Sequence, residues 1–247
     1  LKYSLRSVSK YIPWVRKIHI VTSFNQCPSW IDTNHPKINM VNDYDIMPYG
    51  STPTFNSHAI EANLHNIPDL STNFIYLCDD FYFNSVLTPN HFFRSNTPLS
   101  FFRYGEIAPR GKPIPRDAYR CGIKNANNIL DKTFGIKERT YIKHVVYPLN
   151  VDIYNEMYNQ YSEHLIHTSF ARFRGMLDVC MHSMLMPHWS VESGNGYEGE
   201  INSASYREYM AGKRDHLVGH INHGTKKQVT KAYNRMFNNP SEYELAA

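Results

Sequence analysis

The apolar run that stands out most clearly along the chain is NFIYLCDDFYF, residues 73–83. Phe74 to Leu77 is short, apolar and rich in side chains that favour β structure, so it predicts a buried strand. Asp79 and Asp80 follow almost immediately. In open α/β sheets, ligands bind just outside the carboxyl ends of the strands. We therefore expect a ligand site at this pair of carboxylates.

Other apolar patterns predict the remaining elements. Alternating or continuous runs predict strands at 17–22, 38–41, 98–103 and 216–221. Helical spacing predicts helices at 1–12, 57–67, 125–134, 151–161, 174–186 and 226–237. The alternation predicts an α/β fold with a Rossmann-like (GT-A-like), mostly parallel sheet, flanking helices and an added C-terminal helical part. At 247 residues, we expect one catalytic domain over residues 1–247.

Composition narrows the class of protein. Hydrophobic residues make up 42% and charged residues 19%, as in an ordinary globular domain. The net charge of +4 suits a phosphorylated substrate, but it is too small, without a Lys/Arg run, to indicate a nucleic-acid partner. No apolar run reaches the roughly 18 residues of a membrane span, so we expect no transmembrane segment. The four cysteines are widely spaced, which favours reduced thiols. An oxidising compartment is the alternative.

Adjacent carboxylates repel one another unless something compensates their charge. A divalent cation that joins Asp79 and Asp80 to a diphosphate would remove that cost. The alternative for an isolated Asp-Asp pair is a solvated turn. His58, Glu61 and His65 share one face of the predicted helix, but their spacing is not the i, i+4 histidine pair of zinc hydrolases. We expect Glu61 instead to point at the ligand site from beside the strand.

Several stretches together resemble the Stealth family, which includes bacterial capsule polymerases that transfer hexose-1-phosphate and the animal GlcNAc-1-phosphotransferase of lysosomal enzymes. The family's second conserved region is resembled by LKYSLRSV, PWVRKIHIVT, PTFNSHAIEANLHNIPDLS and FIYLCDDFYF, over most of residues 1–83. The third region is resembled by KHVVYP and HTSFARFRGMLD, and the fourth by HLVGHINHG with NNPSEYE. Residues 104–140 match only loosely.

This resemblance implies a reaction in capsular or surface polysaccharide synthesis. Hexose-1-phosphate would move from a UDP-sugar donor to a hydroxyl of a glycan acceptor, so that UMP leaves and a phosphodiester forms. Asp79 and Asp80 would bind Mg²⁺ or Mn²⁺ against the diphosphate, with Asp80 counted among the catalytic residues. Arg174 would clamp a phosphate, since its guanidinium can bond two oxygens.

The remaining roles fall on both halves of the chain. His144 would act as general base or phosphate donor, and Glu61 would orient the acceptor or compete with His144 as the base. Asp178 and Asn222 would bind substrate or support the metal. The alternatives are an Arg174–Asp178 ion pair on a helix surface and an ordinary loop histidine at His144.

Three features differ from the family's pattern. The family's first region, an upstream strand that carries an aspartate, is missing, so we expect such a strand beside 17–22 or 74–77. Cys78 stands where many members have Asn, and His223 where members usually have Asp. Two other functions stay open: a metal-dependent glycosyltransferase that releases UDP, and an inactive carbohydrate-binding relative. We expect a bacterial cytoplasmic location, with peripheral association at the inner membrane, rather than the Golgi lumen.

Overall fold

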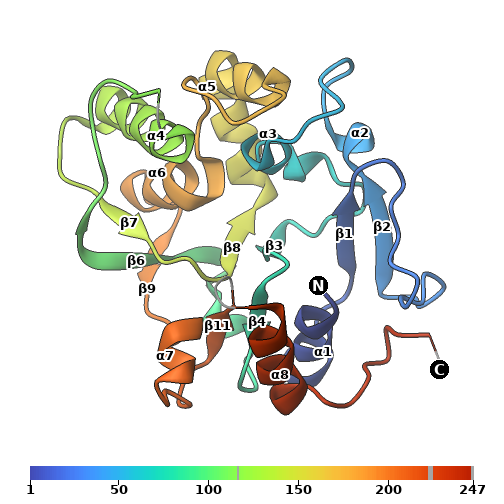
Figure 1. Ribbon diagram of the computed structural model, residues 1–247. Helices are drawn as coiled ribbons and strands as arrows, with labels where there is room; N and C mark the ends of the chain where they lie inside the picture. Colours follow the sequence, from blue (N-terminus) through green and yellow to red (C-terminus); the bar gives the residue numbers. More distant parts are fainter. Residues whose placement is uncertain (116, 222–224, 246–247) are drawn as a thin grey trace.

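The computed structural model describes residues 1–115, 117–221 and 225–245, and its ribbon is drawn in Figure 1. The helices are α1 (Lys2–Tyr11), α2 (Asp43–Ile46), α3 (Ser57–Glu61), α4 (Ala118–Phe134), α5 (Val151–Phe170), α6 (Met186–Glu192), α7 (Tyr206–Met210) and α8 (Lys226–Met236). Shorter helical turns are η1 (Leu64–Asn66), η2 (Pro89–His91) and the π-helical η3 (Met181–Leu185).

The strands are short, apart from one. They are β1 (Ile18–Thr22), β2 (Ile38–Asn42), β3 (Asn73–Tyr76), β4 (Phe81–Phe83), β5 (Phe93–Arg94), β6 (Thr97–Ile107), β7 (Thr140–Ile142), β8 (Tyr147–Asn150), β9 (Tyr197–Gly199), β10 (Ser203–Ser205) and β11 (Val218–His220). Every strand predicted from the apolar pattern has a counterpart here.

The α/β class is confirmed, but the mostly parallel sheet is not. β1 pairs with β2 in parallel, whereas β3 pairs with β8 antiparallel. β11 lies between β10, which is parallel to it, and β4, which is antiparallel. β6 pairs antiparallel with β5 and β7, and parallel with β9. Apolar patterns locate strands, but the direction of pairing is set by long connections, such as the one from β3 to β8, and those patterns do not encode it.

A buried ion-pair cluster fixes the helical side of the molecule. The Arg139 side chain is 1% exposed, and its guanidinium contacts Asp131 of α4 and Glu192 of α6, each at 2.6 Å. A buried guanidinium is tolerated only when it is paired, and here it has a carboxylate on both sides. The cluster ties α4 and α6 to the segment that leads into β7.

The C-terminal part folds back onto the N-terminal helix. The rings of Tyr3 on α1 and Tyr233 on α8 stack with centroids 4.8 Å apart, and Arg6 pairs with Glu244 at 2.6 Å. Helix α8 therefore confirms the helix predicted at 226–237. The region is not only helical, however, because β10 and β11 extend the sheet of β4.

One predicted helix starts later than expected. The helix predicted at 174–186 is irregular through residue 180, and helical structure begins at Met181. The Asp178 carboxylate accepts a hydrogen bond from the backbone N–H of Gly175 at 3.0 Å. Such local side-chain bonds compete with helix formation, which explains the loop.

Within the three described ranges, none of the helices combines the length and apolarity needed to cross a membrane. This agrees with the absence of a long apolar run in the sequence. It does not bear on the predicted peripheral association with the inner membrane.

Candidate functional site

A cleft of about 1250 Å³ brings together segments that are far apart in the sequence. Its walls come from α1, β1, α3 and β3, from the turn after β3, from the segment between β7 and β8, and from η3. Four of the predicted site residues line it: Glu61, Asp79, His144 and Arg174. The second half of the chain therefore reaches the same cleft as the first, as the family resemblance implied.

Glu61 is an almost fully buried carboxylate at the end of α3. It is 4% exposed, and its Oε1 accepts a hydrogen bond of 3.2 Å from the hydroxyl of Tyr76 on β3. Its Oε2 lies 2.9 Å from Nδ1 of His182, close enough for an ion pair but not aligned for a hydrogen bond. Burial raises the pKa of Glu61, but the charge of His182 and smaller contributions from His58 and Arg174 outweigh it. The net pKa is below the ordinary value, so the carboxylate is ionised at neutral pH.

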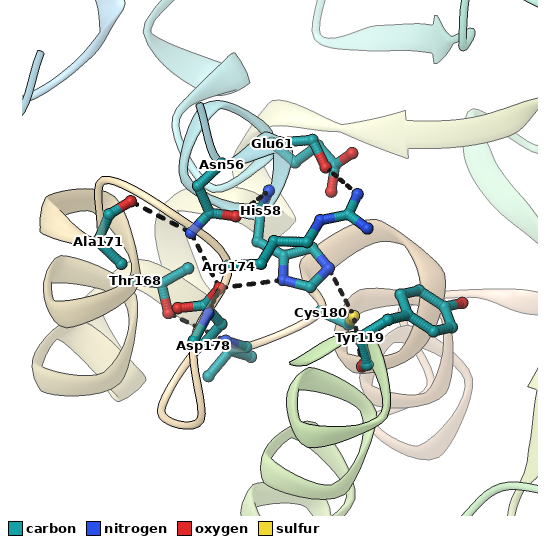
Figure 2. A network of polar contacts seen from close by, with 12 residues as sticks. Asn56, His58, Glu61, Tyr119, Thr168, Ala171, Arg174, Asp178 and Cys180 are labelled. Atoms are coloured by element: carbon teal, nitrogen blue, oxygen red, sulfur yellow. Dashed lines mark hydrogen bonds and ion pairs between the residues drawn. The ribbon is translucent and has the colours of Figure 1, made fainter. Parts of the chain in front are cut away.

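Arg174 lines the same cleft as this carboxylate. Its guanidinium donates a hydrogen bond of 2.5 Å to the hydroxyl of Ser57, at the first turn of α3. Figure 2 shows the Arg174 and Glu61 side chains. The side chain is exposed, so it can meet an anionic ligand in the cleft. Arg174 therefore contacts α3 and not Asp178, which rules out the alternative of a surface Arg174–Asp178 pair.

Asp178 lies behind the cleft and not in it. Its carboxyl group is 1% exposed, and it accepts a hydrogen bond of 2.9 Å from the side-chain amide of Asn56. The same carboxyl lies 3.4 Å from Nδ1 of His58, whose Nε2 contacts Sγ of Cys180 at 3.2 Å (Figure 2). The predicted substrate-binding role does not fit this position. Asp178 instead joins the loop that carries Arg174 to the start of α3.

The two adjacent aspartates occupy a turn between β3 and β4. Asp79 is exposed and lines the cleft, whereas Asp80 is half-buried and does not appear in its wall. The Asp80 carbonyl accepts hydrogen bonds from the N–H of Ile221 at 3.1 Å and the hydroxyl of Tyr233 at 2.9 Å. Burial, and then the charge of Asp79, raise the pKa of Asp80 against the effect of a backbone hydrogen bond. A bound cation would relieve the part of this pKa shift that comes from repulsion between the Asp79 and Asp80 carboxylates.

The donor chemistry of this pair suits a hard divalent cation. Carboxylate oxygens are preferred ligands of Mg²⁺, which often takes one or two carboxylates and completes its shell with water and phosphate oxygens. In the described part of the chain, no group of three or more histidine, cysteine or acidic side chains is placed to bind a metal. Asp79 and Asp80 therefore fit a cation that is held jointly with its substrate.

His144 lies in the segment between β7 and β8. Its Nδ1 is 3.3 Å from the hydroxyl of Tyr147, and its ring meets those of Phe81 and His220 with centroids 4.8 Å and 5.1 Å apart. Desolvation by the cleft walls, and then the charge of His182, lower the pKa of His144 below its ordinary value. The imidazole is thus mainly neutral at pH 7 and able to accept a proton.

Two of the residues considered in the sequence lie outside the described part of the chain, and three residues that contact predicted site residues were not predicted. Asn222 and His223 fall in residues 222–224, so their predicted roles stay predictions. His182, Ser57 and Tyr76 were not singled out, although each contacts a predicted site residue. Ser57 and Tyr76 could have been found by their position beside predicted site residues, whereas His182 carries no local signal.

Comparisons with known proteins identify the family that the sequence resembles. The family models described as Stealth protein CR2, conserved region 2, and Stealth protein CR3, conserved region 3, match residues 1–100 and 143–190. An exopolysaccharide phosphotransferase of Streptomyces coelicolor is 35% identical over 206 residues, which is 83% of this chain and 35% of the relative. A capsular polysaccharide phosphotransferase of Haemophilus influenzae is 34% identical over 194 residues, 76% of this chain and 52% of the relative.

A third relative is the capsular polysaccharide phosphotransferase SacB of Neisseria meningitidis serogroup A. It is 36% identical over 203 residues, which is 80% of this chain and 36% of the relative. The matched part of the chain thus spans between about a third and a half of the length of these curated relatives.

Proposed function

Because this chain belongs to the Stealth family, we propose that it transfers hexose-1-phosphate from a UDP-sugar to a hydroxyl of a polysaccharide acceptor. The relatives carry the names of capsular and exopolysaccharide phosphotransferases, which supports transfer of a phosphorylated group to a glycan. UMP is the second product, and the new linkage is a phosphodiester.

One observation carries this proposal: Arg174 and the ionised carboxylate of Glu61 line the same cleft as His144 and Asp79. A phosphoryl transfer needs a cation near the phosphoryl oxygens and a proton acceptor near the attacking hydroxyl. Both kinds of group lie together here, although they come from segments up to 113 residues apart in the numbering, from Glu61 to Arg174.

The reaction assigns each of these groups a task. The acceptor oxygen attacks the β-phosphorus, and the bond from that phosphorus to the bridging oxygen breaks, so the electron pair leaves with UMP. The hydroxyl proton passes to the neutral imidazole of His144, or to Glu61. Arg174 binds the non-bridging oxygens, whose charge is spread in the transition state, and can do so through two parallel bonds.

Asp79 and Asp80 would hold Mg²⁺ or Mn²⁺ against the diphosphate. The ion, when bound, neutralises charge on the diphosphate and on the departing UMP. The protein's contribution is the turn after β3, which puts Asp79 in the cleft wall and Asp80 next to it in the chain. The half-buried position of Asp80 restrains that turn, since its carbonyl is bonded to Ile221 and Tyr233.

The test is to incubate the full-length protein with a panel of UDP-sugars, Mg²⁺ and glycan acceptors, and to identify the nucleotide released. Release of UMP together with a phosphodiester-linked sugar supports the proposal. Release of UDP would instead identify a glycosyltransferase. Binding of UDP-sugar without turnover would identify an inactive relative.

A further inference from the structure

Two exposed phenylalanines form a pair close in sequence to residues that line the cleft. The rings of Phe55 and Phe173 lie with centroids 5.4 Å apart and planes inclined by 13°. The two residues are 60% and 64% exposed, so much of the surface of each ring is open to solvent. Two nearly parallel stacked rings cover part of each other's inner face, and the outer face of a ring is then a flat apolar surface.

This pair is built next to the candidate site. Phe55 precedes Ser57 by two residues, and Phe173 directly precedes Arg174; Ser57 and Arg174 both line the cleft. The backbone N–H of Phe55 donates to the carbonyl of Arg172 at 2.8 Å, which fixes the two segments together. The position of the ring pair is therefore linked to that of the Arg174 guanidinium.

A cation borders the pair. The Arg172 guanidinium lies 5.7 Å from the centroid of Phe55 and 6.0 Å from that of Phe173, within cation–π range of both rings. The side chain is exposed, and its N–H groups can donate to ligand oxygens at the edge of the rings. A flat apolar surface with hydrogen-bond donors at its edge matches a ligand that has one C–H face and a hydroxyl rim.

We propose that Phe55 and Phe173 form a subsite for a pyranose ring of the glycan acceptor, with Arg172 donating to its hydroxyls. This rests on the proposed function and extends it to the acceptor side of the cleft. The axial C–H groups of a pyranose carry partial positive charge and meet the negative face of an aromatic ring, while the hydroxyls project sideways toward polar groups. A sugar held here lies next to Arg174, where its chain can reach the phosphoryl group.

Docking on a membrane surface is a different use of exposed phenylalanines. Peripheral attachment to anionic lipid relies on clusters of Lys and Arg around the apolar side chains. The two segments that carry the pair, residues 48–56 and 171–178, contain two arginines and no lysine, and one of those arginines faces the cleft. The charge around the pair therefore favours a glycan.

The experiment compares oligosaccharide binding by proteins that have an aromatic side chain at positions 55 and 173 with binding by proteins that have an aliphatic side chain at one of these positions. Full-length wild type and the variants Phe55→Leu, Phe173→Leu and Phe173→Trp are titrated with maltose-series and chitin-series oligosaccharides of two to six sugars, and binding is followed by saturation-transfer NMR. Phe24→Leu is the matched control, because Phe24 is also 64% exposed but lies outside the pair. Hydrolysis of UDP-sugar without acceptor, in which water attacks the β-phosphorus and UMP and hexose-1-phosphate are released, is measured in parallel, since it does not need the subsite.

Each Leu variant is expected to weaken oligosaccharide binding by roughly three- to tenfold, while Phe173→Trp and Phe24→Leu bind as wild type does. Acceptor-free UMP release stays unchanged in all of them. Leu variants that bind as tightly as wild type, or a wild type that binds none of the oligosaccharides, would overturn the subsite. Sedimentation with phosphatidylglycerol vesicles provides a second test, with Phe173→Ala added to the variants. Sedimentation that persists in Phe173→Leu but is lost in Phe173→Ala would also overturn the subsite, because lipid insertion needs an apolar side chain and not a flat one. Oligosaccharide binding without any UMP release would leave the subsite standing and refute the proposed transfer.

Discussion

Glu61 and Arg174 contribute a negative and a positive charge to the wall of the cleft. The carboxylate is buried, yet its pKa lies below the ordinary value, because its interactions with His182, 2.9 Å away, and more weakly with His58 and Arg174 outweigh the effect of burial. Arg174 is exposed and keeps its place through Ser57. An anionic phosphoryl group that enters the cleft thus meets Arg174, while a hydroxyl nucleophile can donate to Glu61 or His144.

Replacing Arg174 by Ala is expected to lower turnover by on the order of 10²-fold or more, because a charge that stabilises the transition state is removed. Arg174→Lys should recover only part of this, since an ammonium cannot form two parallel bonds to a phosphate. Turnover is measured as UMP release under saturating substrate. The exposed Arg235 on α8 provides the control, Arg235→Ala; near-normal turnover of folded Arg174→Ala would contradict the role.

The acid limb of the pH–rate profile reports on His144. Because desolvation lowers the pKa of His144, the neutral base persists as pH falls past about 6.5, the ordinary histidine value. We therefore expect kcat/KM to stay near its maximum through that pH and to fall only in more acidic buffer. In His144→Gln the limb should move or vanish, and turnover should drop by roughly 10²-fold or more. An unchanged limb in this variant would assign the titration to another group.

At the scale of elements, the site depends on how the loop 171–180 is fastened to α3. Asp178 receives hydrogen bonds from Asn56 and from the backbone of Gly175, and it lies beside His58. Thr54 and Asn56 also bond the carbonyl of Ala171. Arg174 and Phe173 are carried on this loop, so the fastening sets the geometry of both the phosphate clamp and the aromatic pair.

Asp178→Ala should destabilise the fold by roughly 3 kcal/mol or more, since several buried donors lose their acceptor at once. Asp178→Asn keeps the shape and should cost less. The measurement is urea-induced unfolding, with the exposed Asp45 of α2, changed to Ala, as the control. A midpoint for Asp178→Ala equal to that of Asp45→Ala would show that the loop is held by other contacts.

The same loop shows which parts of the fold and of the site can be predicted from the sequence. Short apolar runs located β1, β2 and β3, and helical spacing located α1 and α8, because those patterns follow directly from which face is buried. The prediction of a helix at 174–186 was wrong over its first half, because the buried Asp178 carboxylate accepts a hydrogen bond from the backbone N–H of Gly175. The family motif found Glu61 and Arg174, whereas their link through Ser57 and the partner His182 depend on tertiary packing that no local pattern records.

At the scale of the molecule, two small sheets contribute to the wall of the cleft. β1 pairs with β2 and β3 with β8 (Figure 1). Residues of both β1 and β3 line the cleft. In the described residues, no pairing joins these two sheets. Two-stranded sheets are marginal by themselves, and strand edges favour further pairing. A further strand that carried one more acidic ligand could pair with the edge of β1 or of β3.

A longer version of the protein that includes the family's first region should therefore bind Mg²⁺–UDP-sugar more tightly than residues 1–247 alone. The reason is that a strand between β1 and β3 would join the two sheets and add a carboxylate near Asp79. Isothermal titration of both proteins measures the difference, and UMP release measures its effect on turnover. Equal affinity and equal turnover would show that the upstream strand is dispensable.

The central claim is that the bond broken lies between the β-phosphorus and the UMP oxygen. It is tested most directly with a UDP-sugar that carries ³²P in the β-phosphate, incubated with the full-length protein, Mg²⁺ and glycan acceptor. The label is expected to move into the glycan as a phosphodiester, and the released nucleotide is expected to be unlabelled UMP. Label that remains in the nucleotide as UDP, while unlabelled sugar enters the glycan, would contradict it.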